Sequence, residues 1–249
     1  MSHVDNIDGF GKQFHGSFPV TEMFYSLQGE GRYAGYPALF IRLAACNLGC
    51  SWCDTRYTWA AGAVEQAELL SSQQVVRQAG ILRKKNATKS NDVHIVLTGG
   101  EPMLHQDRLP DLIGRLRKDG FGFIEIETNG TIAPNDMMTE LISWWNCSPK
   151  LSNNGRDSSR NRNCDALQEI AETGKADFKF VVANASDVEE IKSDYLPHLP
   201  ADRVWLMPEG YTRSRQIELT PLVIDMAIKN GFRFAVRLHI LAWNNERGR

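Results

Sequence analysis

The sequence predicts an α/β protein built as one domain of repeated strand–helix units. Short apolar and β-branched runs alternate with segments whose apolar residues recur at helical spacing, which favours parallel strands with crossover helices. The least ordinary segments, rich in Cys, Gly, Thr and Pro, mostly follow predicted strands, where β/α barrels place their functional loops. No repeat of fixed period and no Pro/Ser-rich linker divides the 249 residues, so a single domain is expected.

Eight segments are predicted to be strands because β-branched or apolar residues are flanked there by Gly, Pro, Asn or Ser. In chain order they are residues 21–27, 37–44, 93–97, 123–127, 144–148, 177–182, 203–207 and 233–240. Residues 1–19 show no sustained period and are expected to be a flexible extension of a domain spanning 20–249. The polar stretch 150–163 interrupts the alternation and is predicted to be a loop or mobile lid.

Six segments between these strands are predicted to be helices from their apolar spacing. They contain residues 75–82, 109–116, 137–142, 167–171, 186–189 and 222–228. Ser71 or Ser72 can cap the first helix, and Gly120 can end the second. Ser186 and Glu189 have the spacing of a capping box, which predicts that the fifth helix is capped by Ser186.

The composition excludes several classes of protein. With 42% hydrophobic and 23% charged residues, the chain has enough apolar sequence for a core and is not expected to be disordered. Its 28 Lys and Arg against 30 Asp and Glu give a net charge of −2, which indicates neither a nucleic-acid nor a membrane partner. The longest apolar run, 36–46, is broken by Arg42 and is too short to span a membrane. Because nothing resembles a secretory signal, a cytoplasmic location is expected.

Three of the five cysteines, Cys46, Cys50 and Cys53, lie within eight residues. They follow a predicted strand, so their thiolates can converge on one metal centre, and Gly49 supplies turn freedom. Electron-transfer iron–sulfur clusters normally take four Cys ligands, and structural zinc sites also close with four ligands. Three local ligands would leave one iron of a [4Fe–4S] cluster open to a substrate or cofactor.

Two other interpretations of the trio stay open on the residues alone. A structural zinc site would need a fourth ligand from Cys147, Cys164 or a His, and a closed four-Cys cluster would need one of the two distant cysteines. Cys147 ends a Trp-rich predicted strand and is expected to be a buried apolar thiol. Cys164 follows the polar stretch and is expected to have no role in the site.

Several motifs together resemble a known family. Cys46-Asn-Leu-Gly-Cys50-Ser-Trp-Cys53 is similar to the cluster motif of the radical S-adenosylmethionine (SAM) superfamily, and Thr98-Gly-Gly-Glu-Pro102 to its motif for the methionine amino group. More narrowly, residues 21–239 resemble the 7-carboxy-7-deazaguanine synthase family. That narrower resemblance is carried by Leu27-Gln-Gly-Glu-Gly31, Cys53-Asp-Thr55, Ile126-Glu-Thr-Asn-Gly130 and Ser148-Pro-Lys150.

The resemblance implies a modified, incomplete (β/α) barrel of the radical SAM type, with a [4Fe–4S] cluster, SAM and Mg²⁺ as cofactors. It implies a lyase that contracts 6-carboxy-5,6,7,8-tetrahydropterin to 7-carboxy-7-deazaguanine with loss of ammonia, in queuosine or other deazapurine biosynthesis. Hydrogen abstraction from an unactivated carbon is beyond acid–base side chains, so the cofactors would carry it. A homodimer and a separate electron-donor protein are also implied.

The resemblance also assigns the site, without a catalytic residue beyond the cluster and SAM. Cys46, Cys50 and Cys53 would hold the cluster, and Thr55 would ligate magnesium, which prefers oxygen donors. Contacts with SAM are implied for Trp52, Cys53, Asp54, Gly100, Glu101, Ser148, Pro149, Lys150, Met207, Pro208, Glu209 and Gly210. Contacts with the pterin are implied for Leu27, Gln28, Gly29, Arg42, Thr98 and His239.

Charged residues in the predicted strands bear on how a substrate carboxylate is held. Arg42 lies in an apolar strand and requires an anionic partner, since an unpaired buried charge is costly. We expect that partner to be the substrate carboxylate, with Glu125 or Glu127 as the alternatives. Four residues that end or alternate along strands are predicted to give a positive lining, namely Lys150, Lys179, Arg237 and His239. His239 can equally serve as a structural hydrogen-bonding residue.

Two rival functions remain. The first is a radical SAM activase that acts on a protein, against which residues 27–31 and 53–55 argue. The second is a metal-binding or electron-transfer protein without catalysis. Some members of the family contact the pterin through their terminal residues, but residues 239–249 depart from that pattern, so no terminal contact is assigned.

Overall fold

The structure, a computed structural model, describes residues 13–86, 93–155 and 162–249. Its framework is one nine-stranded sheet. The strands are β1 (Ser17–Leu27), β2 (Pro37–Leu43), β3 (Glu68–Ser71), β4 (His94–Gly99), β5 (Ile124–Thr128), β6 (Trp144–Cys147), β7 (Ala176–Val182), β8 (Val204–Pro208) and β9 (Arg233–Phe234). They follow one another across the sheet in the order β3-β1-β2-β4-β5-β6-β7-β8-β9.

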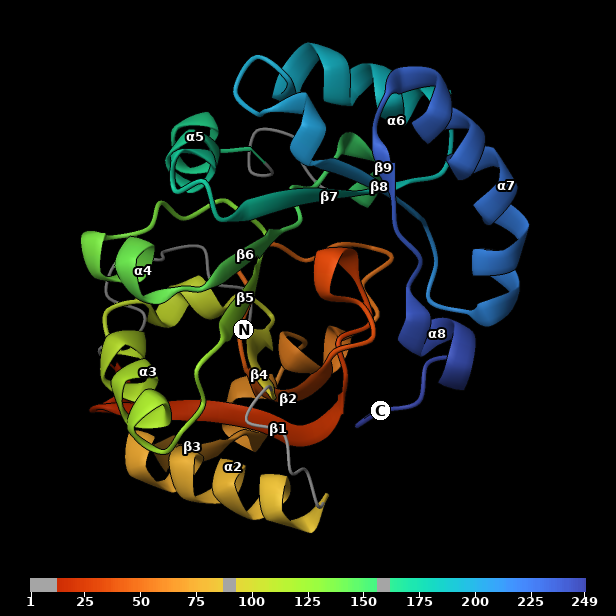
Figure 1. The fold of residues 1–249 in the computed structure, drawn as a ribbon. Helices are drawn as coiled ribbons and strands as arrows, with labels where there is room; N and C mark the ends of the chain where they lie inside the picture. The colour runs from red at the N-terminus through yellow and green to blue at the C-terminus, as the bar shows by residue number, and fades with distance from the viewer. Residues whose placement is uncertain (1–12, 87–92, 156–161) are drawn as a thin grey trace.

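The pairing is parallel from β2 to β9, whereas β1 is antiparallel to both of its neighbours. The predicted α/β class is therefore confirmed. Within the described residues β3 and β9 are the two edges of the sheet, so the barrel is incomplete, as expected. Figure 1 shows the sheet curving around an interior, with α8 (Leu238–Trp243) beside the gap between its ends.

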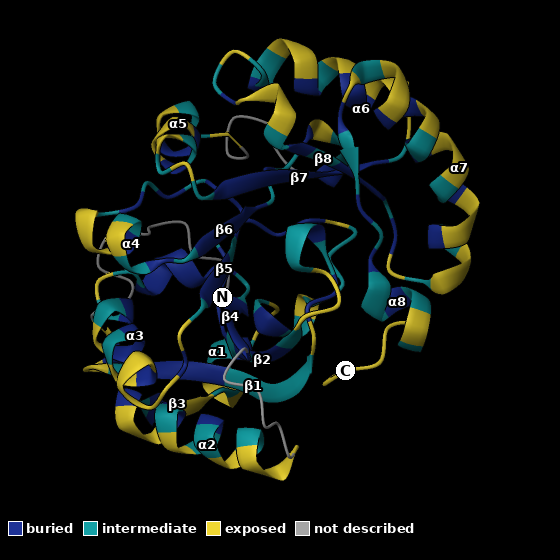
Figure 2. Ribbon diagram, viewed as in Figure 1, coloured by how far each residue is buried: buried dark blue, intermediate teal, exposed yellow. Residues whose placement is uncertain are grey.

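Helices cover the outer face of this curved sheet (Figure 1). They are α2 (Ser72–Lys85), α3 (Leu109–Lys118), α4 (Asp136–Leu141), α5 (Cys164–Glu172), α6 (Ala185–Glu190) and α7 (Arg213–Asn230). The remaining helix, α1 (Ala63–Gln66), is a single turn shortly before β3. Ser71 caps α2 through a capping box with Gln74, which confirms one of the two predicted caps. All seven residues of β7 are buried, as expected of a parallel strand covered on both faces. Figure 2 accordingly shows buried strands inside exposed helix surfaces.

The first strand begins earlier than predicted. β1 starts at Ser17 because Ser17–Val20 pair with Ser71–Glu68 of β3, a strand too short to be recognised from its sequence. Phe14 is already buried, so residues 14–19 of the predicted extension pack with the rest of the fold. The remainder of that extension, residues 1–12, lies outside the described residues.

The prediction of a strand over 233–240 was wrong. β9 contains only Arg233–Phe234, and α8 follows it. The chain leaves the sheet because the Leu238 amide donates to the Gly29 carbonyl at 2.8 Å and Arg237 turns toward carboxylates of the interior. The alternating polarity of residues 233–240 therefore does not come from a strand. It comes from a turn whose polar side chain Arg237 points into the interior.

One further expectation needed correction. The cap of α6 is Asn184, whose side chain accepts hydrogen bonds from the amides of Ser186 and Asp187, while Asp187 closes the capping box. A capping box anchored on Ser186 was therefore wrong, because Asn184 provides the capping oxygen two residues earlier. In the polar stretch, Ser152–Asn154 form a 3₁₀ turn, and residues 156–161 lie outside the described part of the chain.

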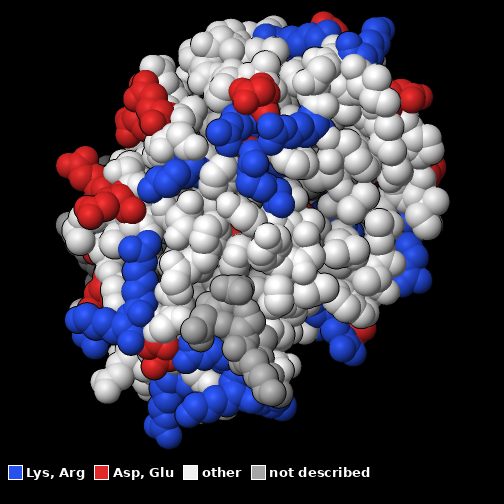
Figure 3. Space-filling view, viewed as in Figure 1, with Lys and Arg blue, Asp and Glu red and all other residues white. Residues whose placement is uncertain are grey.

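The surface does not carry a broad basic patch on the face seen in Figure 3, where positive and negative side chains are interspersed. This distribution agrees with the net charge of −2. None of the helices in the described segments has the length and apolarity needed to cross a membrane.

Candidate active site

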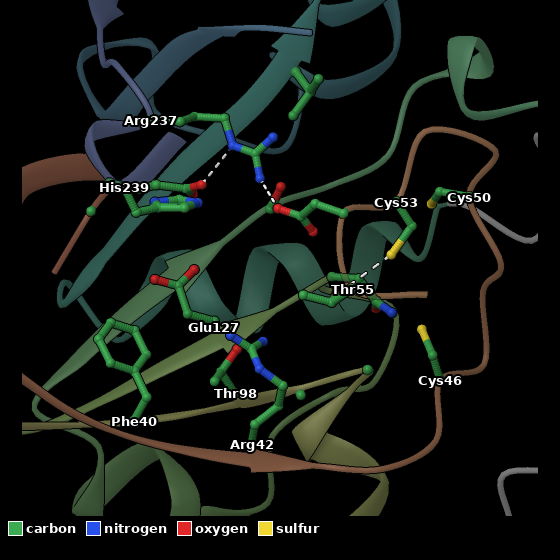
Figure 4. A pocket seen from close by; sticks show the side chains of 18 of the residues that line it. Phe40, Arg42, Cys46, Cys50, Cys53, Thr55, Thr98, Glu127, Arg237 and His239 are labelled. Carbon is green, nitrogen blue, oxygen red and sulfur yellow. Dashed lines mark hydrogen bonds and ion pairs between the residues drawn. The ribbon is translucent and has the colours of Figure 1, made fainter. Parts of the chain in front are cut away.

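A cavity of about 220 Å³ lies at the carboxyl ends of the parallel strands. Its walls come from residues at the end of, or just after, β2, β4, β5, β6, β7 and β8, and from the end of β1. This is the location that strand–helix alternation predicts for a functional site. Figure 4 shows the three clustered cysteines on one side of this cavity and Phe40 and His239 on the other.

The loop that carries the cysteine trio is fixed to the sheet by backbone hydrogen bonds. Ala45 donates to the Thr58 carbonyl at 2.7 Å, and the Ala45 carbonyl accepts from Glu101 N at 2.8 Å. A Cβ at Gly100 would lie 2.1 Å from the Ala45 carbonyl oxygen, so only glycine permits this approach. The Gly99-Gly100 pair at the end of β4 therefore sets the position of the cysteine loop.

Each of the three thiols accepts a hydrogen bond from an N–H group. Leu48 N lies 3.4 Å from Cys46 Sγ, Asn154 Nδ2 lies 3.6 Å from Cys50 Sγ, and Trp59 Nε1 lies 3.2 Å from Cys53 Sγ. Burial raises the pKa of the Cys46 and Cys50 thiols, and iron would have to displace their protons.

This donor set fits an iron–sulfur cluster. All three thiols are free, line one wall of the cavity and have N–H donors of the kind that thiolate ligands accept. Cys147 is fully buried in the core, Cys164 is the first residue of α5, and neither lines the cavity. Among the described residues no three His, Cys, Asp or Glu side chains are close enough to hold a single ion, so the zinc interpretation gains no support.

Glu101 lies behind the cavity wall rather than in it. Its carboxylate is fully buried and accepts from Met103 N at 3.0 Å, Thr128 Oγ1 at 2.8 Å and Asn129 N at 2.7 Å. Burial raises its pKa, which these three donors partly oppose. The geometry makes Glu101 a link between the loops after β4 and β5.

A network of alternating charges forms one side of the cavity. Lys179 Nζ donates to Glu30 at 3.0 Å and to Glu127 at 2.7 Å, and Arg237 donates to Glu30 at 2.9 Å and also pairs with Asp54. Burial would raise the pKa of Glu30, but Lys179 and Arg237 hold it well below its usual range. Burial raises the pKa of Glu127 to about 7, because Lys179 opposes it only in part.

The expected positive lining is therefore largely neutralised. Lys179 and Arg237 each have carboxylate partners, while Lys150 Nζ donates to the carbonyl and hydroxyl oxygens of Ser148, both at 2.8 Å. Arg42 also has a partner, although neither of the expected glutamates: its Nε donates to Glu22 Oε1 at 2.8 Å. The antiparallel register of β1 and β2 places Glu22 opposite Arg42.

Gln28 lines the cavity and connects it to the buried carboxylate of Glu125. Its Nε2 donates to Glu125 at 3.0 Å and to Glu127 at 3.2 Å, and its Oε1 accepts from the Gly29 amide at 2.8 Å. A Cβ at Gly29 would lie 2.3 Å from His239 Nδ1. The connection between β1 and β2 is thus fitted closely against α8.

Comparison with known proteins agrees with this arrangement. Over 232 residues the chain is 38% identical to a 7-carboxy-7-deazaguanine synthase from Pyrobaculum aerophilum, covering 92% of this chain and 96% of that protein. The chain belongs to the 7-carboxy-7-deazaguanine synthase family. An Escherichia coli protein of the same name is 32% identical over 237 residues, covering 89% of this chain and 96% of its own.

Structural comparison agrees with this family membership. The crystal structure of QueE from Escherichia coli matches with a TM-score of 0.68 and 30% identity, covering 92% of this chain and 98% of that one. The structure of anSMEcpe with bound AdoMet matches with a TM-score of 0.51 at 14% identity, which supports the fold alone. The Radical SAM superfamily model matches residues 40–145. The protein is an enzyme of this superfamily, a lyase.

The cavity of this 7-carboxy-7-deazaguanine synthase family member brings together most of the predicted site residues. Those that line it are Leu27, Gln28, Gly29, Arg42, Cys46, Cys50, Trp52, Cys53, Asp54, Thr55, Thr98, Gly100, Ser148, Lys150, Met207 and His239. Those that do not line it are Glu101, Pro149, Pro208, Glu209 and Gly210. The Gly210 carbonyl accepts from Arg237 at 3.0 Å, so the loop after β8 supports the wall from behind.

Sequence reasoning missed several residues of the lining. Phe40 lies two residues before Arg42, on the same face of β2, and its ring stacks on that of Phe24 at 4.8 Å between centroids. Strand alternation could have found Phe40. Glu30 lies within the Leu27–Gly31 motif, directly after three predicted pterin residues, but was given no contact. Trp59 had no such signal, because the turn Arg56–Thr58 brings it to the cavity.

Proposed function

We propose that this chain converts 6-carboxy-5,6,7,8-tetrahydropterin to 7-carboxy-7-deazaguanine with loss of ammonia, a step of queuosine-type biosynthesis. One observation carries the proposal: the cysteine trio, Gly100 and the pterin-type residues Leu27, Gln28 and Gly29 line the same cavity. A cofactor at the cysteines and a substrate at the end of β1 would therefore share one enclosed space. The identity of the reaction is inferred from the membership of the chain in the 7-carboxy-7-deazaguanine synthase family.

We assign the cofactor contacts from this lining. Cys46, Cys50 and Cys53 would hold a [4Fe–4S] cluster, and Trp52, Asp54, Gly100, Ser148, Lys150 and Met207 would surround SAM. When bound, these two groups supply the one-electron chemistry that creates a radical on the substrate. Lys150, held by Ser148, offers a cation to a carboxylate at this end of the cavity.

The substrate end is built to hold a polar, planar molecule. Arg42 presents a planar guanidinium and Thr98 a hydroxyl from neighbouring strands, paired as Arg42 and Thr98 in the register of β2 and β4. Phe24 and Phe40 give this end an apolar wall that excludes water. Glu127, with its pKa raised to about 7, can hold or release a proton at a carboxylate oxygen near neutral pH.

We further propose that magnesium binds at Thr55. Thr55 lines the cavity, and its hydroxyl oxygen lies 3.5 Å from Cys53 Sγ. Magnesium is often bound by only one or two protein oxygens, with water and substrate completing its coordination. We also propose a single domain that includes all of β1 from Ser17 onward, a homodimer, a separate electron-donor protein and a cytoplasmic location. Light scattering measures the oligomer, and product formation with and without EDTA measures the need for magnesium.

One anaerobic experiment tests the reaction and separates the rivals. Reconstituted protein receives SAM, dithionite, Mg²⁺ and 6-carboxy-5,6,7,8-tetrahydropterin, and products are identified by mass spectrometry. We expect 7-carboxy-7-deazaguanine and ammonia in equal amounts. Formation of 5′-deoxyadenosine without that product would assign another substrate, as an activase requires. Protein that never cleaves SAM and holds zinc or no iron would refute the radical interpretation, and zinc would support a metal-binding protein without catalysis.

A further inference from the structure

Two side-chain N–H groups are directed at cysteine sulfurs of the trio, and both come from outside the Cys46–Cys53 loop. Trp59 follows the turn Arg56–Thr58, and its indole Nε1 lies 3.2 Å from Cys53 Sγ. That turn is tied to the cysteine loop because Ala45 N donates to the Thr58 carbonyl at 2.7 Å. The indole donor is therefore held in place by the fold.

The second donor, Asn154, comes from the polar stretch to which the sequence assigned no role. It is fully buried, and its Nδ2 lies 3.6 Å from Cys50 Sγ. Two more hydrogen bonds fasten this turn to the trio: Ser51 N donates to the Asn154 carbonyl at 2.9 Å, and Trp52 Nε1 donates to the Asn153 carbonyl at 3.1 Å. A Cβ at Gly155 would come within 3.0 Å of Ser51 Oγ, so the contact is close.

We propose that Trp59 and Asn154 are positioning residues that set the reduction potential of the cluster through N–H···S hydrogen bonds. Reduction adds one negative charge that is shared by the thiolate ligands. A donor at the sulfur stabilises the reduced form more than the oxidised form, so its loss makes the potential more negative. The proposal rests on the proposed function, because it requires that the trio holds an iron–sulfur cluster.

The structure offers matched controls for both donors. Trp144→Phe removes a buried indole N–H on β6 that neither lines the cavity nor donates to a sulfur. Asn153→Ala removes the neighbouring amide, whose Nδ2 donates to the Val181 carbonyl at 3.0 Å. If the two controls keep the wild-type potential, a shift in Trp59→Phe or Asn154→Ala reports the N–H···S bond itself.

The test is a redox titration followed by electron paramagnetic resonance on reconstituted protein without SAM, with iron and sulfide measured for every variant. At the wild-type midpoint potential, we expect Trp59→Phe and Asn154→Ala each to lower the ratio of reduced to oxidised cluster about threefold, and the double variant to lower it further. Asn154→Leu, which keeps a similar shape, adds no charge and removes the donor, replaces Asn154→Ala if that variant loses iron.

Equal potentials in wild type and both variants, at full iron content, would overturn the inference and leave the proposed function standing. Equal shifts in the Trp144→Phe and Asn153→Ala controls would also overturn it. A wild-type protein that takes up no iron and sulfide would instead refute the proposed cluster, and with it this inference.

Discussion

Lys179 Nζ donates to Glu127 Oε2 at 2.7 Å, at a point where the lysine side chain has no solvent exposure. The same ammonium also contacts Glu30 at 3.0 Å. Removing one partner of a buried ion pair leaves the other charge uncompensated. We predict that Lys179→Met lowers the free energy of unfolding by about 3–5 kcal/mol, measured by urea denaturation.

The matched control is Lys192→Met, since Lys192 pairs with Glu189 at 2.9 Å on the surface. An exposed pair of this kind contributes little, so the control should change stability by about 0.5 kcal/mol or less. Equal effects of the two substitutions would contradict the role given to Lys179. Adding Glu127→Gln to Lys179→Met should recover part of the loss, because it removes one unpaired carboxylate.

The two carboxylates beside Lys179 should give opposite pH dependence. Burial raises the pKa of Glu127 from 4.5 to about 7, so the folded state binds a proton that the unfolded state releases. Its contribution to stability is complete below about pH 4.5 and is lost as the pH rises to about 7. Glu30, whose folded pKa is lowered, contributes stability above its unfolded pKa that is lost in acid.

We therefore predict that Glu127→Gln removes a decline in stability between about pH 4.5 and 7. Urea unfolding of wild type and variant at half-unit pH intervals measures the difference. Parallel curves for the two proteins would show that Glu127 does not titrate in this range. Glu189→Gln, at an exposed position, is the control and should run parallel to wild type.

The sequence was most informative where neighbouring residues act together. Cys46, Cys50 and Cys53 belong to one short loop, so their spacing in the sequence was enough to predict that they come together. In the structure all three line the cavity. The partners of Arg42 and Lys179 could not be predicted, because Glu22 reaches Arg42 through antiparallel register and Glu30 reaches Lys179 from 149 residues away. Periodicity shows which face a residue occupies, but not which strand lies opposite.

A long-range contact also explains why the strand predicted over residues 233–240 was wrong. Residues 233–240 alternate in polarity, yet Arg237 is drawn out of the sheet by Glu30, Asp54 and the Gly210 carbonyl. An ion pair between residues 207 positions apart determines the backbone path there. Such a pair cannot be predicted from the residues next to Arg237 in the sequence.

Substitution of the cysteines should divide them into two groups. Cys46→Ala, Cys50→Ala and Cys53→Ala are each expected to lose most of the iron and sulfide taken up in reconstitution, because a cluster with two protein ligands is weakly held. Cys147→Ala and Cys164→Ala should retain it, since neither side chain lines the cavity. Loss of iron from either of the last two would mean that the ligand set is wrong.

Gly100 and Gly114 provide a matched pair of glycine-to-alanine substitutions. A Cβ at Gly100 would lie 2.1 Å from the Ala45 carbonyl oxygen and 2.9 Å from Cys46 Cβ, so the cysteine loop must move. We expect Gly100→Ala to cost about 1–3 kcal/mol of stability and to weaken SAM binding, measured by calorimetry. Gly114 lies within α3 with nothing within 4 Å of an added Cβ. Gly114→Ala should therefore stabilise the protein by about 0.5–1 kcal/mol.

Arg42 provides the sharpest test of the substrate end. Its Nε donates to Glu22 Oε1 at 2.8 Å, and Tyr57 Oη donates to the same oxygen at 2.7 Å, so the guanidinium is held in a fixed plane. With Nε engaged by Glu22, the two terminal nitrogens can meet a substrate carboxylate side by side. Lysine would keep the charge but lose this paired geometry.

We predict that Arg42→Lys raises KM for the tetrahydropterin about tenfold with a smaller change in kcat, measured by anaerobic steady-state kinetics. Arg32→Lys is the matched control, because Arg32 Nε also donates to a buried carboxylate, Asp177 at 2.9 Å, but does not line the cavity. It should leave both constants near their wild-type values. A fall in kcat at constant KM in Arg42→Lys would show that Arg42 acts on a step after binding.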